Sequence, residues 1–179
     1  MKLKYCFLLA FIFWLTSEPR AAGIAAELAE KAEDIFVIDG CPNRPGTGKQ
    51  VVLVSGDEEY RSEEVLPQLA KILSGQHGFD CVVLFAINPE TQQIDPNFRH
   101  HIPGLQHLQN ADAMVIATRF RDLPDKQMRQ IDHFLRRGGS VVGMRTATHG
   151  FNIPAAKPYA HYGNGYQGEK EFWRGGFGR

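Results

Sequence analysis

The sequence predicts an α/β fold in which a mostly parallel sheet is covered by helices on both faces. From residue 51 to residue 144, short apolar runs of strand length alternate with segments of helical character. Clusters of polar residues directly follow three of the apolar runs. Because ligands of open α/β sheets bind outside the carboxyl ends of the strands, these clusters are the first place to look for function.

Four apolar runs are expected to form the parallel strands, and a weaker one forms a small extra strand at residues 35–38. The four runs are residues 51–55, 81–87, 113–118 and 140–144. The last run is continuous and flanked by glycines, which predicts a strand covered on both faces. Right-handed crossovers would bring the carboxyl ends of the strands to one edge of the sheet.

Two segments between the strands carry apolar residues at the spacing of one helix face. The first helix is expected to begin near Glu64, because Pro67 is tolerated only in a first turn. Gly75 or Gly78 would end this helix, since glycine is favoured directly after a helix. The second helix is expected over residues 124–137.

The amino-terminal residues predict export from the cytoplasm. Two lysines precede an apolar run at residues 6–15, and small residues follow, which is typical of a signal peptide over residues 1–23. The alternative is an uncleaved anchor, although the run is shorter than the ~20 residues of a membrane span. Residues 24–50 would form a lead-in to a domain over residues 51–179, located in the periplasm or outside the cell.

Composition argues against several partners. The chain has 20 basic and 20 acidic residues, so it lacks the basic excess that nucleic-acid binding requires.

Cys41 and Cys81 form a disulfide or stay free, and the spacing favours neither. His100, His101 and His107 show no metal-ligand pattern, so neither a metal nor a cofactor is expected.

Three stretches resemble the ThuA-like (trehalose-utilisation) domain of the class I glutamine amidotransferase-like superfamily. They are residues 52–61, 118–124 and 143–149. The resemblance implies a three-layer, flavodoxin-like fold and a small-molecule carbohydrate, such as a keto-sugar, as partner. It covers about two thirds of such a domain, so the C-terminal part is expected to be missing. A homo-oligomer is left open, and no membrane contact is expected after signal cleavage.

The sequence departs from true amidotransferases at the elbow after the last strand. That elbow reads G-x-C-x-G in amidotransferases, whereas residues 143–147 read Gly-Met-Arg-Thr-Ala. Arg145 therefore takes the place of the nucleophilic cysteine. Many ThuA-like domains carry a histidine there, so the arginine departs from their pattern too. Because a guanidinium has no nucleophilic lone pair, glutamine hydrolysis through a thioester is excluded at this position.

The polar residues after the strands form the candidate site. The candidate catalytic residues are His149 and Glu58, and the candidate substrate-binding residues are Asp57, Arg119, Arg145 and Thr146. The arginines would hold hydroxyl or carbonyl oxygens, while a carboxylate or the histidine would move a proton. In the alternative interpretation, Arg145 pairs with Asp57 or Glu58, the acidic loop is solvated and His149 lies on the surface. Arg119 and Arg121 alternate, so one is expected to face the edge and the other solvent, with Arg119 favoured for the site.

Two other functions remain open from the sequence. One is a non-catalytic interaction or scaffold domain that kept the fold, and the other is a flavodoxin-like redox domain, which would bind a yellow cofactor. Residues 152–179 are rich in aromatic side chains and would form either a platform for sugar rings or a connector. Enzyme activity is therefore not assigned from the sequence.

Overall fold

The structure is a computed structural model that describes residues 35–168. The predicted signal peptide and residues 169–179 of the aromatic tail lie outside the described residues. The strands are β1 (Ile35–Ile38), β2 (Gln50–Gly56), β3 (Asp80–Leu84), β4 (Ile87–Asn88), β5 (Gln93–Ile94), β6 (Ala113–Thr118) and β7 (Ser140–Gly143). The helices are α2 (Ser62–Ile72), α3 (Asp125–Arg136) and the short helices η1 (Leu73–His77), η2 (Leu105–Gln109), η3 (Ala147–His149) and η4 (Ala160–Tyr162).

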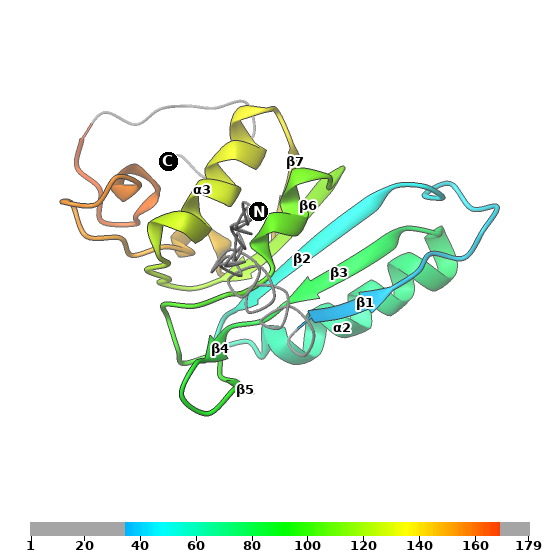
Figure 1. Ribbon diagram of the computed structural model, residues 1–179, viewed down its shortest axis with the longest axis horizontal. Coiled ribbons are helices and arrows are strands. Elements are labelled where there is room, and N and C mark those ends of the chain that lie inside the picture. Colours follow the sequence, from blue (N-terminus) through cyan, green and yellow to red (C-terminus); the bar gives the residue numbers. More distant parts are fainter. Residues whose placement is uncertain (1–34, 169–179) are drawn as a thin grey trace, which may run out of the picture. The chain divides into compact units, whose positions relative to one another are not determined.

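Five strands form one sheet in the order β1-β3-β2-β6-β7 (Figure 1). β2, β3, β6 and β7 are parallel to one another, and β1 joins the border of the sheet antiparallel to β3. The predicted α/β fold with a mostly parallel sheet is therefore confirmed, and the strand order is consistent with a flavodoxin-like fold. The chain leaves β2 to one side for β3 and then crosses to the other side for β6.

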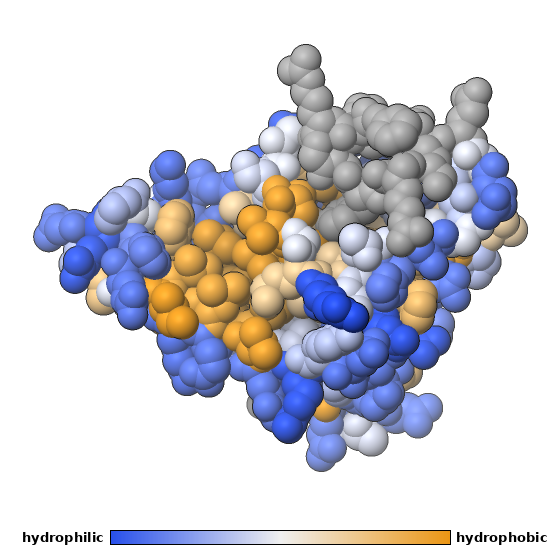
Figure 2. Space-filling view, turned by 180° about the vertical axis from the view of Figure 1, so that it is seen from behind, coloured by the Kyte–Doolittle hydropathy of each residue, from blue (hydrophilic) through white to orange (hydrophobic). Residues whose placement is uncertain are grey.

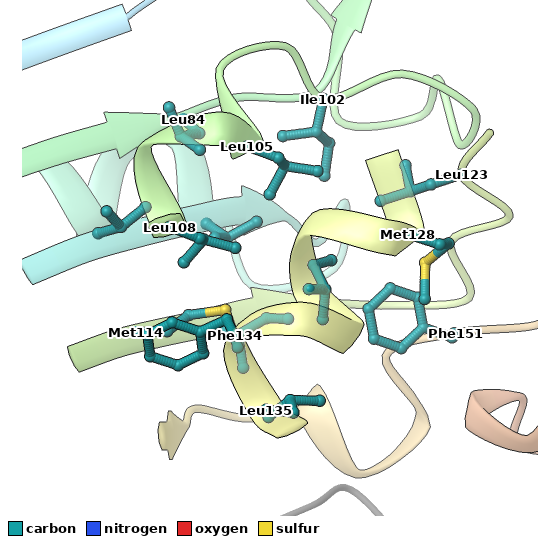
Figure 3. Packing of buried hydrophobic residues seen from close by; sticks show 14 of the residues in the cluster. Leu84, Ile102, Leu105, Leu108, Met114, Leu123, Met128, Phe134, Leu135 and Phe151 are labelled. Carbon is teal, nitrogen blue, oxygen red and sulfur yellow. The ribbon is translucent and has the colours of Figure 1, made fainter. Parts of the chain in front are cut away.

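Alternating residues of β2 divide the core into two layers. Val52 and Val54 pack with the core on the α3 side, whereas Val51 and Leu53 pack with the core on the α2 side. Figure 3 shows the larger α3-side core, where residues of β6, η2 and α3 meet. Because a strand turns successive side chains to opposite faces, continuous apolar runs produce cores on both faces of the sheet.

The first helix begins earlier than the sequence predicts. α2 starts at Ser62 rather than Glu64, so Pro67 lies inside the helix and beyond its first turn. The Ser62 hydroxyl accepts a hydrogen bond from the Asp57 amide at 3.0 Å, which ties the helix start to the loop after β2. The helix continues into the turn η1 and ends at Gly78, whose φ of 80° suits glycine.

Two strand predictions need correction. The run at residues 81–87 does not form one strand, because β3 ends at Leu84 and β4 pairs separately with β5. The expectation that the last strand is covered on both faces is wrong. β7 pairs only with β6 among the described residues, and Val142 keeps 56% of its surface exposed. The face of β7 that carries Val142 is therefore left open by the described residues, while Val141 on the other face packs against the α3-side core.

Further surface features follow from the same packing. Hydrophobic residues gather on the face seen in Figure 2, and exposed apolar side chains include Val65 and Ile72 of α2.

Cys41 is exposed and Cys81 is buried, and both are free thiols. Burial, together with the nearby charge of Asp80, raises the pKa of Cys81 to about 11. Within residues 35–168, no helix is long and apolar enough to span a membrane.

Candidate functional site

The candidate site lies where the order of the sheet reverses, between the carboxyl ends of β2 and β6. The segments after β2, β6 and β7 all leave the sheet at this edge, because the three strands are parallel. In a doubly wound sheet, a reversal of strand order keeps the two neighbouring loops apart and leaves room for a ligand. The predicted convergence of the three polar clusters on one edge is confirmed.

Asp57 is a buried carboxylate that shapes the loop after β2. Its Oδ1 accepts hydrogen bonds from the amides of Glu59 at 2.8 Å and Tyr60 at 3.2 Å. Its Oδ2 accepts a hydrogen bond from the Thr146 hydroxyl at 2.8 Å. Both oxygens are therefore occupied inside the protein, which is how a buried carboxylate avoids the cost of desolvation.

Thr146 joins the ends of three strands. It follows β7 and is buried, with 4% of its surface exposed. Besides its bond to Asp57, its hydroxyl oxygen lies 3.3 Å from the carbonyl oxygen of Thr118, the last residue of β6. The threonine therefore fixes the turn after β7 to both strands at the reversal point.

Glu58 is held between arginines from the segment after β6. Its Oε1 accepts a hydrogen bond from Nη1 of Arg119, and its Oε2 accepts one from Nη2 of Arg121 at 2.8 Å. Arg99 approaches the same Oε1 at 3.8 Å, beyond hydrogen-bond distance. Nε of Arg119 also forms an ion pair with Glu59 at 3.1 Å. The hydrogen bond to Glu58 and the surrounding carboxylates raise the pKa of Arg119.

Arg121 is fully buried and is the hub of this network. Besides Glu58, it donates to the carbonyl oxygens of Arg119 at 2.7 Å, Pro96 at 2.9 Å and Phe98 at 3.0 Å. Burial lowers the pKa of Arg121, and Glu58 opposes this effect. The expectation that one arginine of the pair faces solvent is therefore wrong, because both bind Glu58 and the side chain of Arg121 has 0% exposure.

Arg145 and His149 lie at the same edge with fewer partners. The guanidinium carbon of Arg145 lies 4.9 Å from the centre of the Tyr60 ring, and this ring is the partner of Arg145 within residues 35–168. The alternative in which Arg145 pairs with Asp57 or Glu58 is wrong. The half-buried His149 packs its ring against Phe120 at 5.2 Å between centres, and its Nδ1 lies 3.2 Å from the Thr148 hydroxyl.

These residues divide into two groups. The anchored group has buried or multiply bonded side chains and comprises Asp57, Glu58, Arg119, Arg121 and Thr146. The open group has exposed or half-buried side chains and comprises Tyr60, Phe120, Arg145 and His149. Phe120 connects the two, because the guanidinium of Arg119 lies 4.7 Å from the centre of its ring.

Sequence reasoning missed three contributors to this site. Because Arg119 and Arg121 alternate along the chain, the sequence favours Arg119 for the site and leaves Arg121 out of it. Tyr60 and Phe120 stand next to predicted site residues, and an aromatic residue beside a polar cluster is the signal that would have found them. Two aromatic residues of the tail, Tyr159 and Tyr162, lie elsewhere and pack against the α3-side core.

Neither metal binding nor comparison with known proteins assigns a function to this site. Within the part of the chain that the structure describes, no group of three or more His, Cys, Asp or Glu side chains is arranged to hold a metal ion. No family model, no curated protein and no solved structure matches the chain. The site must therefore be interpreted from its own geometry.

Proposed function

We propose that this protein is an exported, ThuA-like domain that binds or transforms a carbohydrate and lacks glutamine amidotransferase activity. The observation that carries the proposal is the division of polar residues at the reversal point into an anchored and an open group. The anchored group keeps the three strand ends in register, while the open group presents a guanidinium, an imidazole and two aromatic rings. Sugars are bound by such a combination of hydrogen-bond donors and aromatic faces.

Arg145 is the binding residue of this proposal, and His149 is its acid or base. The donors of Arg145 would hold a hydroxyl or carbonyl oxygen of the sugar, and the imidazole of His149, at the same edge of the sheet, would move a proton. Asp57, Thr146 and Arg119 hold the loops that carry these side chains. Glu58, the second catalytic candidate, would move a proton only after exchanging an arginine for substrate, since arginines occupy both of its oxygens.

The binding experiment measures the affinity of the purified protein for a panel of neutral sugars and keto-sugars by calorimetry. Arg145→Ala should weaken binding about tenfold or more, the usual effect of removing a charged hydrogen-bond donor. Arg44→Ala is the matched control, because Arg44 is an exposed arginine in the loop before β2, at the amino ends of the strands. Circular dichroism verifies that both variants fold. Unchanged binding in Arg145→Ala would contradict the proposal.

A second candidate function is a non-catalytic interaction or scaffold domain. The observation that favours it is the occupation of all four carboxylate oxygens of Asp57 and Glu58 by protein donors, which leaves neither carboxylate free to act as a base. Turnover of a sugar by the wild-type protein that is lost in His149→Ala would exclude this candidate. Binding without turnover of any sugar in the panel would favour it.

A further inference from the structure

Two arginines at the carboxyl edge have no carboxylate within hydrogen-bond distance. Among the described residues, Arg119 and Arg121 pair with Glu58 or Glu59, whereas Arg99 and Arg145 form no such close pair. The three carboxylates are all engaged by protein donors. A positive charge that no neighbouring carboxylate compensates attracts anions to this edge.

Both of these arginines, Arg99 and Arg145, are exposed. The Arg99 side chain keeps 47% of its surface exposed and reaches Glu58 only at 3.8 Å. Arg145 is exposed, and within residues 35–168 its partner is the Tyr60 ring rather than a carboxylate. Arg119 and Arg121, in contrast, both donate to Glu58, and Arg121 also donates to backbone carbonyls.

The contact with Tyr60 leaves the best donors of Arg145 available. Among the described residues, no acceptor takes a hydrogen bond from Arg145, so its N–H groups stay available beside the ring. Those N–H groups form a fork that matches two oxygens of a carboxylate or a phosphate. The ring therefore orients the fork without occupying it, and the ordering cost of the side chain is reduced before a ligand arrives.

We infer that the carbohydrate bound at this edge carries an anionic group, a carboxylate or a phosphate, which is bound by the guanidinium fork of Arg145 with support from the charge of Arg99. This inference rests on the proposed carbohydrate binding and narrows its substrate class to acidic sugars. A neutral sugar hydroxyl would use a single donor of the fork and none of its charge, so it would be bound more weakly.

The test compares ligands that differ only in charge. D-glucuronate and its amide, D-glucuronamide, present the same ring and differ in the carboxylate, while glucose 6-phosphate tests a phosphate on the same sugar. Calorimetric affinities are measured for the wild-type chain, Arg145→Gln, Arg145→Lys and the control Arg44→Gln. Acetate and inorganic phosphate show whether the anion alone suffices.

The wild-type protein should bind glucuronate or glucose 6-phosphate at least tenfold more tightly than glucuronamide. Arg145→Gln should abolish this preference, and Arg145→Lys should retain part of it because lysine keeps the charge but not the fork. Arg44→Gln should leave it unchanged. The preference should also decrease as salt concentration rises, because exposed charges are screened.

The failures are distinguishable. Equal affinity for glucuronate, glucose 6-phosphate and glucuronamide would overturn the anionic substrate and leave the proposed carbohydrate binding intact. A preference that survives Arg145→Gln would overturn the role of Arg145. Acetate or phosphate binding as tightly as the sugar acids would retain an anion site and overturn the carbohydrate. A wild-type protein that binds none of these compounds would overturn both proposals.

Discussion

The ends of β2 and β6 differ sharply from the end of β7, although all three lie at one edge of the sheet. After β2 and β6, the charged side chains bind one another and backbone carbonyls. Arg121, for example, donates hydrogen bonds to Glu58 and to the carbonyl oxygen of Pro96. After β7, Thr146 is anchored, while its neighbour Arg145 is exposed and lies over the Tyr60 ring. Charge at a strand end is therefore not a sufficient sign of a binding residue, because some of it holds the loops together.

The largest effect is expected from removing the buried hub. Arg121→Met keeps most of the side-chain volume but leaves Glu58 and the carbonyls of Pro96 and Phe98 without this donor. The free energy of unfolding, measured with urea, should fall by about 3–5 kcal/mol, as for other broken buried ion pairs. Arg99→Met, which removes an exposed arginine near the same glutamate, should cost less than about 1 kcal/mol. Similar losses in the two variants would contradict the anchored group.

A smaller loss is expected at the threonine that joins the strand ends. Thr146→Val preserves the shape but leaves Oδ2 of the buried Asp57 without its hydroxyl donor. The free energy of unfolding should fall by about 1–3 kcal/mol, the cost of an unsatisfied buried acceptor. The control is Thr148→Val, two residues further along, where the side chain is exposed and the expected change is within about 0.5 kcal/mol. A neutral Thr146→Val would show that Asp57 does not depend on this bond.

The contact between Tyr60 and Arg145 should contribute little to stability. A double-mutant cycle with Tyr60→Leu and Arg145→Gln should give a coupling free energy of about 0.5–1 kcal/mol, typical of an exposed cation–π pair. A coupling above about 2 kcal/mol would place Arg145 among the anchored residues. Because Tyr60 orients the arginine, Tyr60→Leu should also weaken the binding of glucuronate, which the same calorimetry measures.

The smallest effect is expected on the open face of β7. Val142→Thr should change the free energy of unfolding by no more than about 0.5 kcal/mol, since this side chain is exposed on a border strand. Its neighbour Val141 packs against the α3-side core, so Val141→Thr should cost about 1 kcal/mol or more for a hydroxyl placed there. A cost at Val142 as large as about 1 kcal/mol would mean that β7 is covered on both faces after all.

Most of the fold was predictable because its signals are local. The apolar runs, the helical stripes and the position of Gly78 lie within short windows, and they sufficed for the alternation of strands and helices. The start of α2 was misplaced because the Ser62 hydroxyl bonds to the loop after β2, a contact that Pro67 alone does not reveal. The open face of β7 was missed because an apolar run does not show whether another layer packs on each of its faces.

The sequence by itself determined which strand ends carry polar residues and that parallel strands bring them to one edge, because both follow from periodicity and crossover handedness. Only the tertiary structure decided which residues are anchored and which are open. Arg121 and Glu58 are 63 positions apart, and Thr146 and Asp57 are 89 apart. Contacts over such distances leave no trace in local spacing, because packing alone decides which guanidinium is buried and which stays at the surface.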